Sequence, residues 1–161
     1  MKRMHVHVNV TDLASSVRYY TTLFGSAPTK LEPEYAKWML DDPRVNFAIS
    51  QQGRTPGLDH LGIQAESREE LDAIAARLAT ADVETLKQEG TTCCYAKSDK
   101  AWSEDPSGIK WESFHTLGDA TVYGESAPRE ASACCTPRAG AAAAASCCAP
   151  GAGRAASGCC S

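Results

Sequence analysis

The sequence predicts an α+β fold in which two tandem βαβββ modules form a metal-binding cleft, followed by a disordered, cysteine-rich tail. The first observation behind this prediction is an internal repeat, because the predicted order of strand, helix and three strands occurs twice. His5 precedes one presumed helix start, Asp12, by seven residues, and His60 precedes the other, Ser67, by the same interval. The second observation is an abrupt change of composition near the C-terminus. Two such modules are expected to pair into one curved sheet, with the helices outside and the cleft inside.

The 161 residues suffice for one domain and a tail. We expect the domain at residues 1–118, with modules at about 1–51 and 58–118, and the tail at 119–161. From Gly124 to Ser161 the chain has no Leu, Ile, Val, Met, Phe, Tyr or Trp. Such a composition buries too little apolar surface to offset the entropy of ordering, so this segment is predicted to be flexible.

The first module begins at residues 4–10, where apolar side chains alternate with polar ones that include His5 and His7. The alternation predicts a strand whose polar face is either solvated or lines a polar cavity. A helix is predicted to start at Asp12 and to end at Gly25. Turn residues separate three further strands, which are expected near residues 28–31, 35–40 and 45–50.

The second module follows a polar, glycine- and proline-bearing link at residues 51–57. Residues 58–64 alternate again, with His60 on the polar face. The segment from Ser67 to Glu70 fits a capping box for the helix behind it. The remaining strands are expected near residues 83–88, 93–97 and 110–116.

Charge and composition exclude several classes of function. Acidic side chains exceed basic ones by four, and no run of Lys or Arg points to a nucleic-acid partner. The first residues lack the apolar block of a signal peptide, and no stretch is long enough for a membrane span. We therefore expect a cytoplasmic protein with no membrane partner, whose cysteines stay reduced and act as ligands or reactive groups. The sequence leaves a homodimer open.

A metal site is predicted in the cleft. The polar faces of the two module-first strands bring His5 and His60 to equivalent positions, and Glu112 adds a carboxylate on the same face as Phe114. Two imidazoles and one carboxylate leave the other side of a metal open, which suits non-haem Fe(II) with O2 as co-substrate. Mn or Zn fit the same ligands, and His7 is the obvious substitute ligand. Taken singly, each residue could be an ordinary polar strand residue, but their placement in a repeat favours the metal.

All eight cysteines occur as four adjacent pairs. Neighbouring cysteines make a strained disulfide but a good two-point clamp for a soft, thiophilic centre. Cys93 and Cys94 lie inside the domain and are predicted to form such a clamp. Because strand geometry sends adjacent side chains to opposite faces, joint binding requires an irregular backbone around residues 91–94. The other six cysteines are expected to be auxiliary thiols that bind soft metal ions: Cys134, Cys135, Cys147, Cys148, Cys159 and Cys160.

Four segments of the domain carry a resemblance to a known family. They are His5-Val-His-Val-Asn-Val-Thr-Asp-Leu, Tyr19-Tyr20-Thr-Thr-Leu-Phe-Gly25, Leu58-Asp59-His60-Leu-Gly-Ile and Asp105-Pro-Ser-Gly-Ile-Lys-Trp-Glu112. Together they resemble the vicinal oxygen chelate superfamily, which includes glyoxalases, fosfomycin-resistance proteins and extradiol dioxygenases. The resemblance covers roughly residues 1–118 and implies the fold, while the superfamily runs several chemistries on that scaffold.

A narrower resemblance rests on Thr92-Cys93-Cys94-Tyr95-Ala96, followed by Asp99-Lys100-Ala101-Trp102. These segments resemble the organoarsenical carbon–arsenic lyases and the related cadmium-induced proteins. The resemblance implies an Fe(II)-dependent, O2-consuming, dioxygenase-type enzyme that cleaves the carbon–arsenic bond of trivalent organoarsenicals, such as methylarsenite or trivalent aromatic arsenicals. Release of inorganic arsenite would give organoarsenical resistance.

The same resemblance implies roles for individual residues. Cys93 and Cys94 would be the arsenic ligands, and His5, His60 and Glu112 the metal ligands, with Glu112 and His60 as catalytic residues. Family members often have Gln at the place of His5. Two other functions are compatible with the residues: a cadmium- or arsenite-binding metal-resistance protein, and a glyoxalase-like metalloenzyme without redox chemistry. Oxygen consumption with a trivalent organoarsenical separates the lyase from both.

Overall fold

A computed structural model describes residues 1–121 and 123–124 of the chain. All of these residues lie within one compact unit, Met1–Pro128. The six tail cysteines and most of the predicted tail lie outside the described residues. None of the helices in the described ranges has the length and apolar character that crossing a membrane requires.

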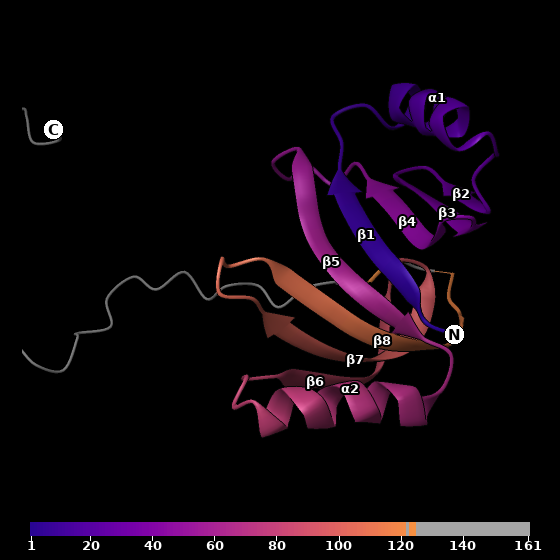
Figure 1. The fold of residues 1–161 in the computed structure, drawn as a ribbon. Coiled ribbons are helices and arrows are strands. Elements are labelled where there is room, and N and C mark those ends of the chain that lie inside the picture. Colours follow the sequence, from indigo (N-terminus) through magenta and orange to yellow (C-terminus); the bar gives the residue numbers. More distant parts are fainter. Residues whose placement is uncertain (122, 125–161) are drawn as a thin grey trace, which may run out of the picture. The chain divides into compact units, whose positions relative to one another are not determined.

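The observed order of elements is the predicted repeat of strand, helix and three strands (Figure 1). The first module comprises β1 (Arg3–Asn9), α1 (Leu13–Phe24), β2 (Lys30–Glu32), β3 (Tyr35–Asp41) and β4 (Arg44–Ser50). The second comprises β5 (Gly57–Ala65), α2 (Arg68–Thr80), β6 (Leu86–Cys93), β7 (Ala96–Glu104) and β8 (Lys110–Asp119). The α+β fold of two βαβββ modules is confirmed. The domain boundary at residue 118 stays a prediction.

The eight strands form one curled sheet, a half-barrel, in the order β2-β3-β4-β1-β5-β8-β7-β6, with both helices on its outer side (Figure 1). The two modules meet where β1 and β5 pair antiparallel, and each of these strands pairs in parallel with the last strand of its own module. In the central pair His5 lies opposite Gly62 and His7 opposite His60. A two-fold exchange of the modules therefore relates His5 to His60 and His7 to Gly62.

The outer face of the first module carries an aromatic core. Tyr20 and Phe24 of α1 pack on Trp38 and Phe47 of the sheet, with ring centroids 4.6–6.0 Å apart. The helix begins and ends as predicted, because the Asp12 carboxylate accepts a hydrogen bond from the Ser15 N–H at 2.8 Å and Gly25 adopts φ 66°. Most apolar residues of β1, β3 and β4 thus turn outward, which leaves polar side chains such as His5, His7 and Ser50 for the inside.

The second module has a smaller core, in which Ala65, Leu71 and Ala101 form the buried apolar cluster. Its helix starts at the predicted cap, where the Ser67 hydroxyl accepts a hydrogen bond from the Glu70 N–H at 3.3 Å. Charged contacts supplement the packing: Arg68 binds Asp99 and Glu89 on the neighbouring hairpin, each at 2.9 Å.

The strand predicted at residues 93–97 is wrong. β6 extends to Cys93, β7 starts at Ala96, and the two residues between them form the turn of a hairpin. Cys94 and Tyr95 both adopt positive φ, 54° and 59°, which is the backbone of a two-residue type I′ turn. Such turns usually contain Asn or Gly, so the residue types gave no signal for this one.

Candidate metal and thiol site

Three histidines meet on the inner face of the sheet. His5 and His7 come from β1 and His60 from β5, and their ligand atoms all lie within 4.8 Å of one another. The side chains are buried, because alternate residues of these strands turn away from the outer core into the curve of the sheet. Nitrogen ligands gathered in this way indicate a divalent metal site.

Glu112 of β8 joins two of these histidines. The Nε2 atoms of His5 and His60 lie 3.2 Å apart, and the Glu112 Oε2 atom lies 3.6 Å from the first and 3.4 Å from the second. A point equidistant from the three atoms lies about 2.0 Å from each, which fits the ~2.0–2.2 Å bonds of a divalent metal to nitrogen and oxygen. The residues present therefore fit a metal with two imidazoles and one carboxylate.

Gly62 makes the approach of Glu112 to His5 possible. It lies between them in the sheet, opposite His5 on one side and Glu112 on the other. A Cβ atom at position 62 would lie 2.3 Å from the Glu112 carbonyl oxygen and 3.3 Å from the His5 Cβ atom. Only glycine allows the three strands this spacing, and the sequence analysis did not find this role.

The ligand side chains are oriented by partners that the sequence analysis missed. The Nδ1–H of His5 donates to the Asn46 carbonyl oxygen at 2.9 Å, and that of His60 donates to the Asp59 carboxylate at 2.6 Å. Both rings therefore turn Nε2 toward the common point, as metal-binding histidines usually do. The adjacency of Asp59 to His60 was the available signal for one of these partners.

Lys100 holds the other side of the Glu112 carboxylate. Its ammonium group donates to Glu112 Oε1, and both side chains are buried. Burial works against a carboxylate, but this cation and His60 outweigh it and hold the pKa of Glu112 well below its usual range. Glu112 is thus an anion, with Oε2 available to a metal.

The histidines differ in basicity. Burial lowers the pKa of His5 to about 4 and that of His7 to about 3, so both imidazoles are neutral at pH 7. Burial also disfavours the charged form of His60, but hydrogen bonds to Asp59 and Glu112 outweigh it and raise its pKa to about 9. Without a metal, His60 at pH 7 therefore carries a second ring proton and a positive charge. Metal binding at Nε2 would release this second proton.

His7 is bound differently from the other two histidines. Its Nε2 atom contacts the Ser50 hydroxyl at 2.8 Å, and its buried Nδ1 atom has no hydrogen-bond partner among the described residues. His7 is therefore close to the metal point but is anchored by another group.

The cysteine pair sits at the tip of the β6–β7 hairpin. Cys93 ends β6 and is 2% exposed, while Cys94 occupies the first position of the turn. The positive φ at Cys94 departs from strand geometry and brings the two Sγ atoms to 2.8 Å. The irregular backbone predicted at residues 91–94 is confirmed, and non-glycine residues in this conformation are typical of functional sites.

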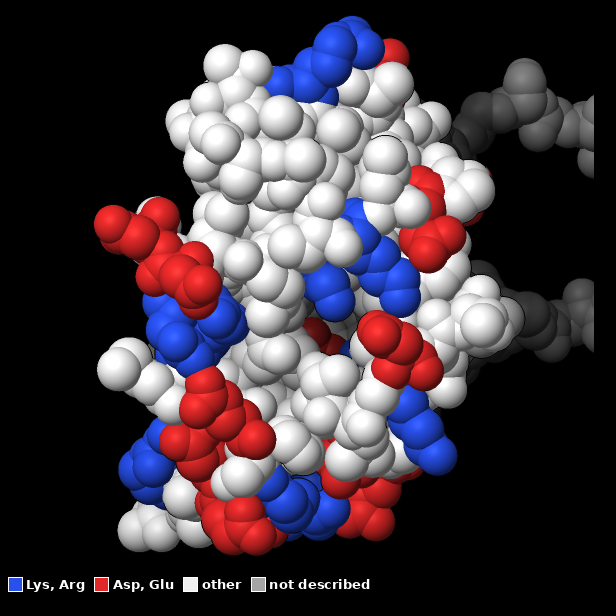
Figure 2. All heavy atoms as spheres, turned by 90° about the vertical axis from the view of Figure 1, so that its right-hand side faces the viewer, with Lys and Arg blue, Asp and Glu red and all other residues white. Residues whose placement is uncertain are grey.

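One pocket contains both thiols and two of the candidate metal ligands. Its volume is about 40 Å³, and Cys93, Cys94, His5 and Glu112 are among the residues that line it. Figure 2 shows a hollow in one face of the molecule where basic and acidic side chains gather. The structure thus brings together the cysteine pair and the three predicted metal ligands, although they come from four different strands and a turn.

The two thiols ionise unequally. The Cys94 side chain and, against the effect of burial, Lys100 lower the pKa of Cys93, whereas the Cys93 side chain and burial raise the pKa of Cys94 well above its usual range. Cys93 is therefore the more acidic of the two thiols, and ionisation of Cys94 is opposed by Cys93.

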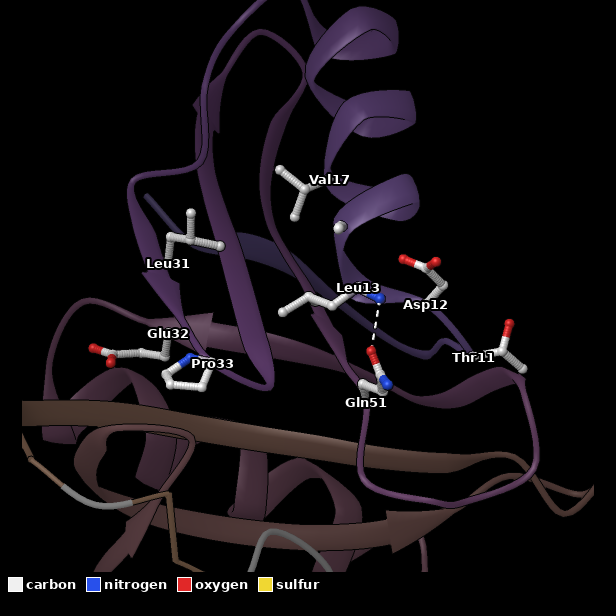
Figure 3. Close-up of a pocket in the computed structure, with 9 residues that line it drawn as sticks. Thr11, Asp12, Leu13, Val17, Leu31, Glu32, Pro33 and Gln51 are labelled. Atoms are coloured by element: carbon white, nitrogen blue, oxygen red, sulfur yellow. Dashed lines mark hydrogen bonds between the residues drawn. The ribbon is translucent and has the colours of Figure 1, made fainter.

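A larger groove of about 760 Å³ lies at the start of α1, where Leu13 and Val17 face Leu31 and Pro33 (Figure 3). The Leu13 N–H donates to Gln51 there at 2.8 Å. The histidine cluster, which is the metal-ligand group found among the described residues, does not line it. Its size alone does not make it the reactive site.

Known proteins are similar to this chain in sequence and in fold. The model of the Glyoxalase/Bleomycin resistance protein/Dioxygenase superfamily matches residues 2–113. A trivalent organoarsenical cleaving enzyme from Bacillus sp. (strain MD1) is 40% identical over 150 residues, covering 86% of this chain and 93% of that protein. Cadmium-induced protein CadI from Mycobacterium tuberculosis (strain ATCC 25618 / H37Rv) is 38% identical over 143 residues, covering 84% and 93%.

Among solved structures, an extradiol ring-cleaving dioxygenase from B. fuscum superposes with a TM-score of 0.56 at 19% identity, covering 73% of this chain and 33% of that one. This likeness supports the fold. The family model and the two sequence relatives go further: the chain belongs to the glyoxalase/bleomycin resistance protein/dioxygenase superfamily and, within it, to the family of the trivalent organoarsenical cleaving enzymes and cadmium-induced protein CadI.

Proposed function

We propose that this protein cleaves the carbon–arsenic bond of trivalent organoarsenicals, with Fe(II) as metal and O2 as co-substrate, and releases inorganic arsenite. The observation that carries the proposal is the shared pocket, in which the Cys93–Cys94 pair faces His5 and Glu112. The name of the Bacillus relative, a trivalent organoarsenical cleaving enzyme, supports the same chemistry.

In this proposal the thiols capture the substrate. Trivalent arsenic with one carbon substituent has two exchangeable positions, and the Sγ atoms, 2.8 Å apart on one hairpin, can fill both. Capture fixes the direction of the remaining arsenic–carbon bond inside the pocket, which converts an encounter into a positioned reaction. Because Cys93 is buried, the captured arsenic is also shielded from water.

We propose His5, His60 and Glu112 as the Fe(II) ligands, with Glu112 and His60 acting directly at the reacting centre. The 3.2–3.6 Å spacing of their ligand atoms supports this set over one that includes His7, which is tied to Ser50. Bound Fe(II) with open positions would supply the activation of O2. Mn or Zn fit the same donors, and metal analysis decides between them.

The tail is proposed to supply auxiliary thiols. Its three pairs, Cys134–Cys135, Cys147–Cys148 and Cys159–Cys160, repeat the arrangement of the pair in the pocket. Soft metal ions and trivalent arsenic bind such thiols well. This role is independent of the metal cluster.

A second function, sequestration of cadmium or arsenite, is favoured by the CadI relative and by the number of thiols. The test uses full-length protein purified without O2 and loaded with Fe(II). We expect methylarsenite to cause O2 uptake in step with the release of inorganic arsenite. Binding of methylarsenite or cadmium without O2 uptake would instead support sequestration, and turnover without O2 would support a glyoxalase-like reaction.

A further inference from the structure

Lys37 is a cation in the thiol pocket that forms no ion pair within 4 Å with any of the described residues. It projects from β3 and lines the same pocket as Cys93 and Cys94. The other pocket lysine, Lys100, is paired with Glu112, and nearby Lys30 contacts Asp119 at 3.6 Å. Among the described residues the ammonium group of Lys37 has no hydrogen bond or ion pair, although the residue is half-buried.

An unpaired lysine at this depth is costly, because burial disfavours its charge. Burial and the neighbouring Lys30 lower the pKa of Lys37, while Cys94 and Asp119 act in the opposite direction. Lys37 and Cys94 line the same pocket, and a thiolate at Cys94 favours the charged form of Lys37. Its thiol is also the one whose ionisation is opposed by Cys93 and by burial.

We propose that Lys37 is the counter-charge for the Cys94 thiolate and assists the second of the two thiols when arsenic is captured. The proposal rests on the proposed function, since it assigns a positioning residue to the capture step. Lys37 would act through the cysteine pair and not at the metal.

The capture step balances without a redox partner. A trivalent organoarsenical with two hydroxyl groups exchanges two arsenic–oxygen bonds for two arsenic–sulfur bonds. The two thiol protons leave with the two hydroxyl groups as two molecules of water, and arsenic stays trivalent. Cys93 supplies the first thiolate, aided by Lys100. Lys37 stabilises the negative charge that develops on Cys94 as the second bond forms.

Other charged and titratable groups also face the thiol pair, and a pH study has to account for them. Tyr35 comes from the same strand as Lys37, Lys100 from β7 and Glu112 from β8. Tyr123 follows β8, and its hydroxyl interacts with the side chains of Cys94 and Ser50. Lys37 and Lys100 are the cations of this set, and only Lys100 has an acidic partner within the described ranges.

The experiment measures capture directly, in full-length protein whose six tail cysteines are replaced by serine, without metal and without O2. Methylarsenite is the probe, and the loss of free thiols gives the rate. We expect Lys37→Met to slow capture roughly tenfold at pH 7, the effect of about one unit of thiol pKa. Lys37→Arg should restore most of the rate. The control, Lys97→Met, removes an exposed charge from the hairpin that carries the cysteine pair and should leave the rate unchanged.

A Lys37→Met variant that captures methylarsenite at the wild-type rate would overturn the proposal. So would a loss of rate that Lys37→Arg does not restore, since that pattern indicates a general effect on folding and not a role of the charge. The same measurements distinguish the role of Lys37 in capture from the proposed lyase function. Wild-type protein that captures methylarsenite with the expected dependence on Lys37, but shows no O2-dependent cleavage when loaded with Fe(II), would remove the lyase function and keep the role of Lys37.

Discussion

Ala48 in the first module and Glu112 in the second occupy equivalent places in the sheet. Each lies on the last strand of its module and pairs with a residue of the module's first strand. Ala48 of β4 lies opposite His7 of β1, and Glu112 of β8 lies opposite Gly62 of β5. The first module pairs a large ring, His7, with a small residue, whereas the second pairs a glycine with the carboxylate. The site is therefore one-sided: two histidines come from equivalent positions, but the anionic side chain comes from the second module alone.

The hydrophobic cores of the two modules also differ. The first module buries an aromatic cluster around Trp38 and Phe47, while the second relies on smaller residues such as Ala65 and on charged contacts of Arg68. The second module also carries the cysteine hairpin and Lys100. We interpret the first module mainly as scaffold and the second as the part that carries most of the reactive groups, a division that substitutions can test.

The largest effect is expected at Glu112, because no equivalent carboxylate exists in the first module. Glu112→Gln keeps the shape of the side chain but removes the charge, and it should weaken Fe(II) binding at least ~100-fold, beyond the effect of losing an orienting partner. Metal titration of the anaerobic protein measures this. The matched control is Glu104→Gln, which neutralises an exposed carboxylate on the neighbouring strand.

Wild-type Fe(II) affinity in Glu112→Gln would contradict the ligand assignment. If His7→Ala then removed the metal, the three histidines would be the ligands. The first module would then supply two of them, His5 and His7, and the second module only His60.

A smaller effect is expected at Gly62, the partner of Glu112 in the sheet. Gly62→Ala places a Cβ atom 2.3 Å from the Glu112 carbonyl oxygen, so the strands have to move apart. We expect the free energy of unfolding to fall by about 1–3 kcal/mol, as in other overpacked sites, with weaker metal binding. Urea unfolding measures the change. Gly118→Ala, on β8 like Glu112, meets nothing within 4 Å and should change stability by less than ~0.5 kcal/mol. Equal stability of the two variants would count against tight packing at this junction.

The two-module fold could be predicted from the sequence, but the turn at the cysteine pair and the charge contacts between strands could not. The spacing of His5 and His60 before the helix caps predicted the repeat, since strand and helix periodicities are local properties. An irregular backbone was predicted at residues 91–94, but the turn at Cys94 and Tyr95 that interrupts the expected strand at 93–97 was not, because its residues lack the usual turn signal. The pairing of Lys100 with Glu112, and the lack of an ion pair at Lys37 within the described part of the chain, depend on contacts between strands, which no local pattern encodes.

The smallest effect on the folded modules is expected from the tail. Replacing the six tail cysteines with serine should leave the melting temperature and Fe(II) stoichiometry unchanged while lowering the number of cadmium or arsenite ions bound per chain. Substitution is preferable to deletion at residue 118, because residues beyond 118 contact the domain. Ala120 donates a backbone hydrogen bond to the Tyr95 carbonyl at 2.9 Å, and Gly124 forms an antiparallel β-bridge with Cys93. A large drop in melting temperature would show that these cysteines stabilise the domain, against the proposed auxiliary role.

The central claim is that the cysteine pair captures arsenic while a separate cluster binds the metal. The most direct measurement compares Cys93→Ser, Cys94→Ser and the double variant with the parent protein, all with serine in the tail and loaded with Fe(II). A hydroxyl is a far poorer ligand for soft centres than a thiolate. The parent should consume O2 and release inorganic arsenite from methylarsenite, while all three variants should bind Fe(II) normally and fail to do so. Turnover by the double variant at the parent rate would contradict the account.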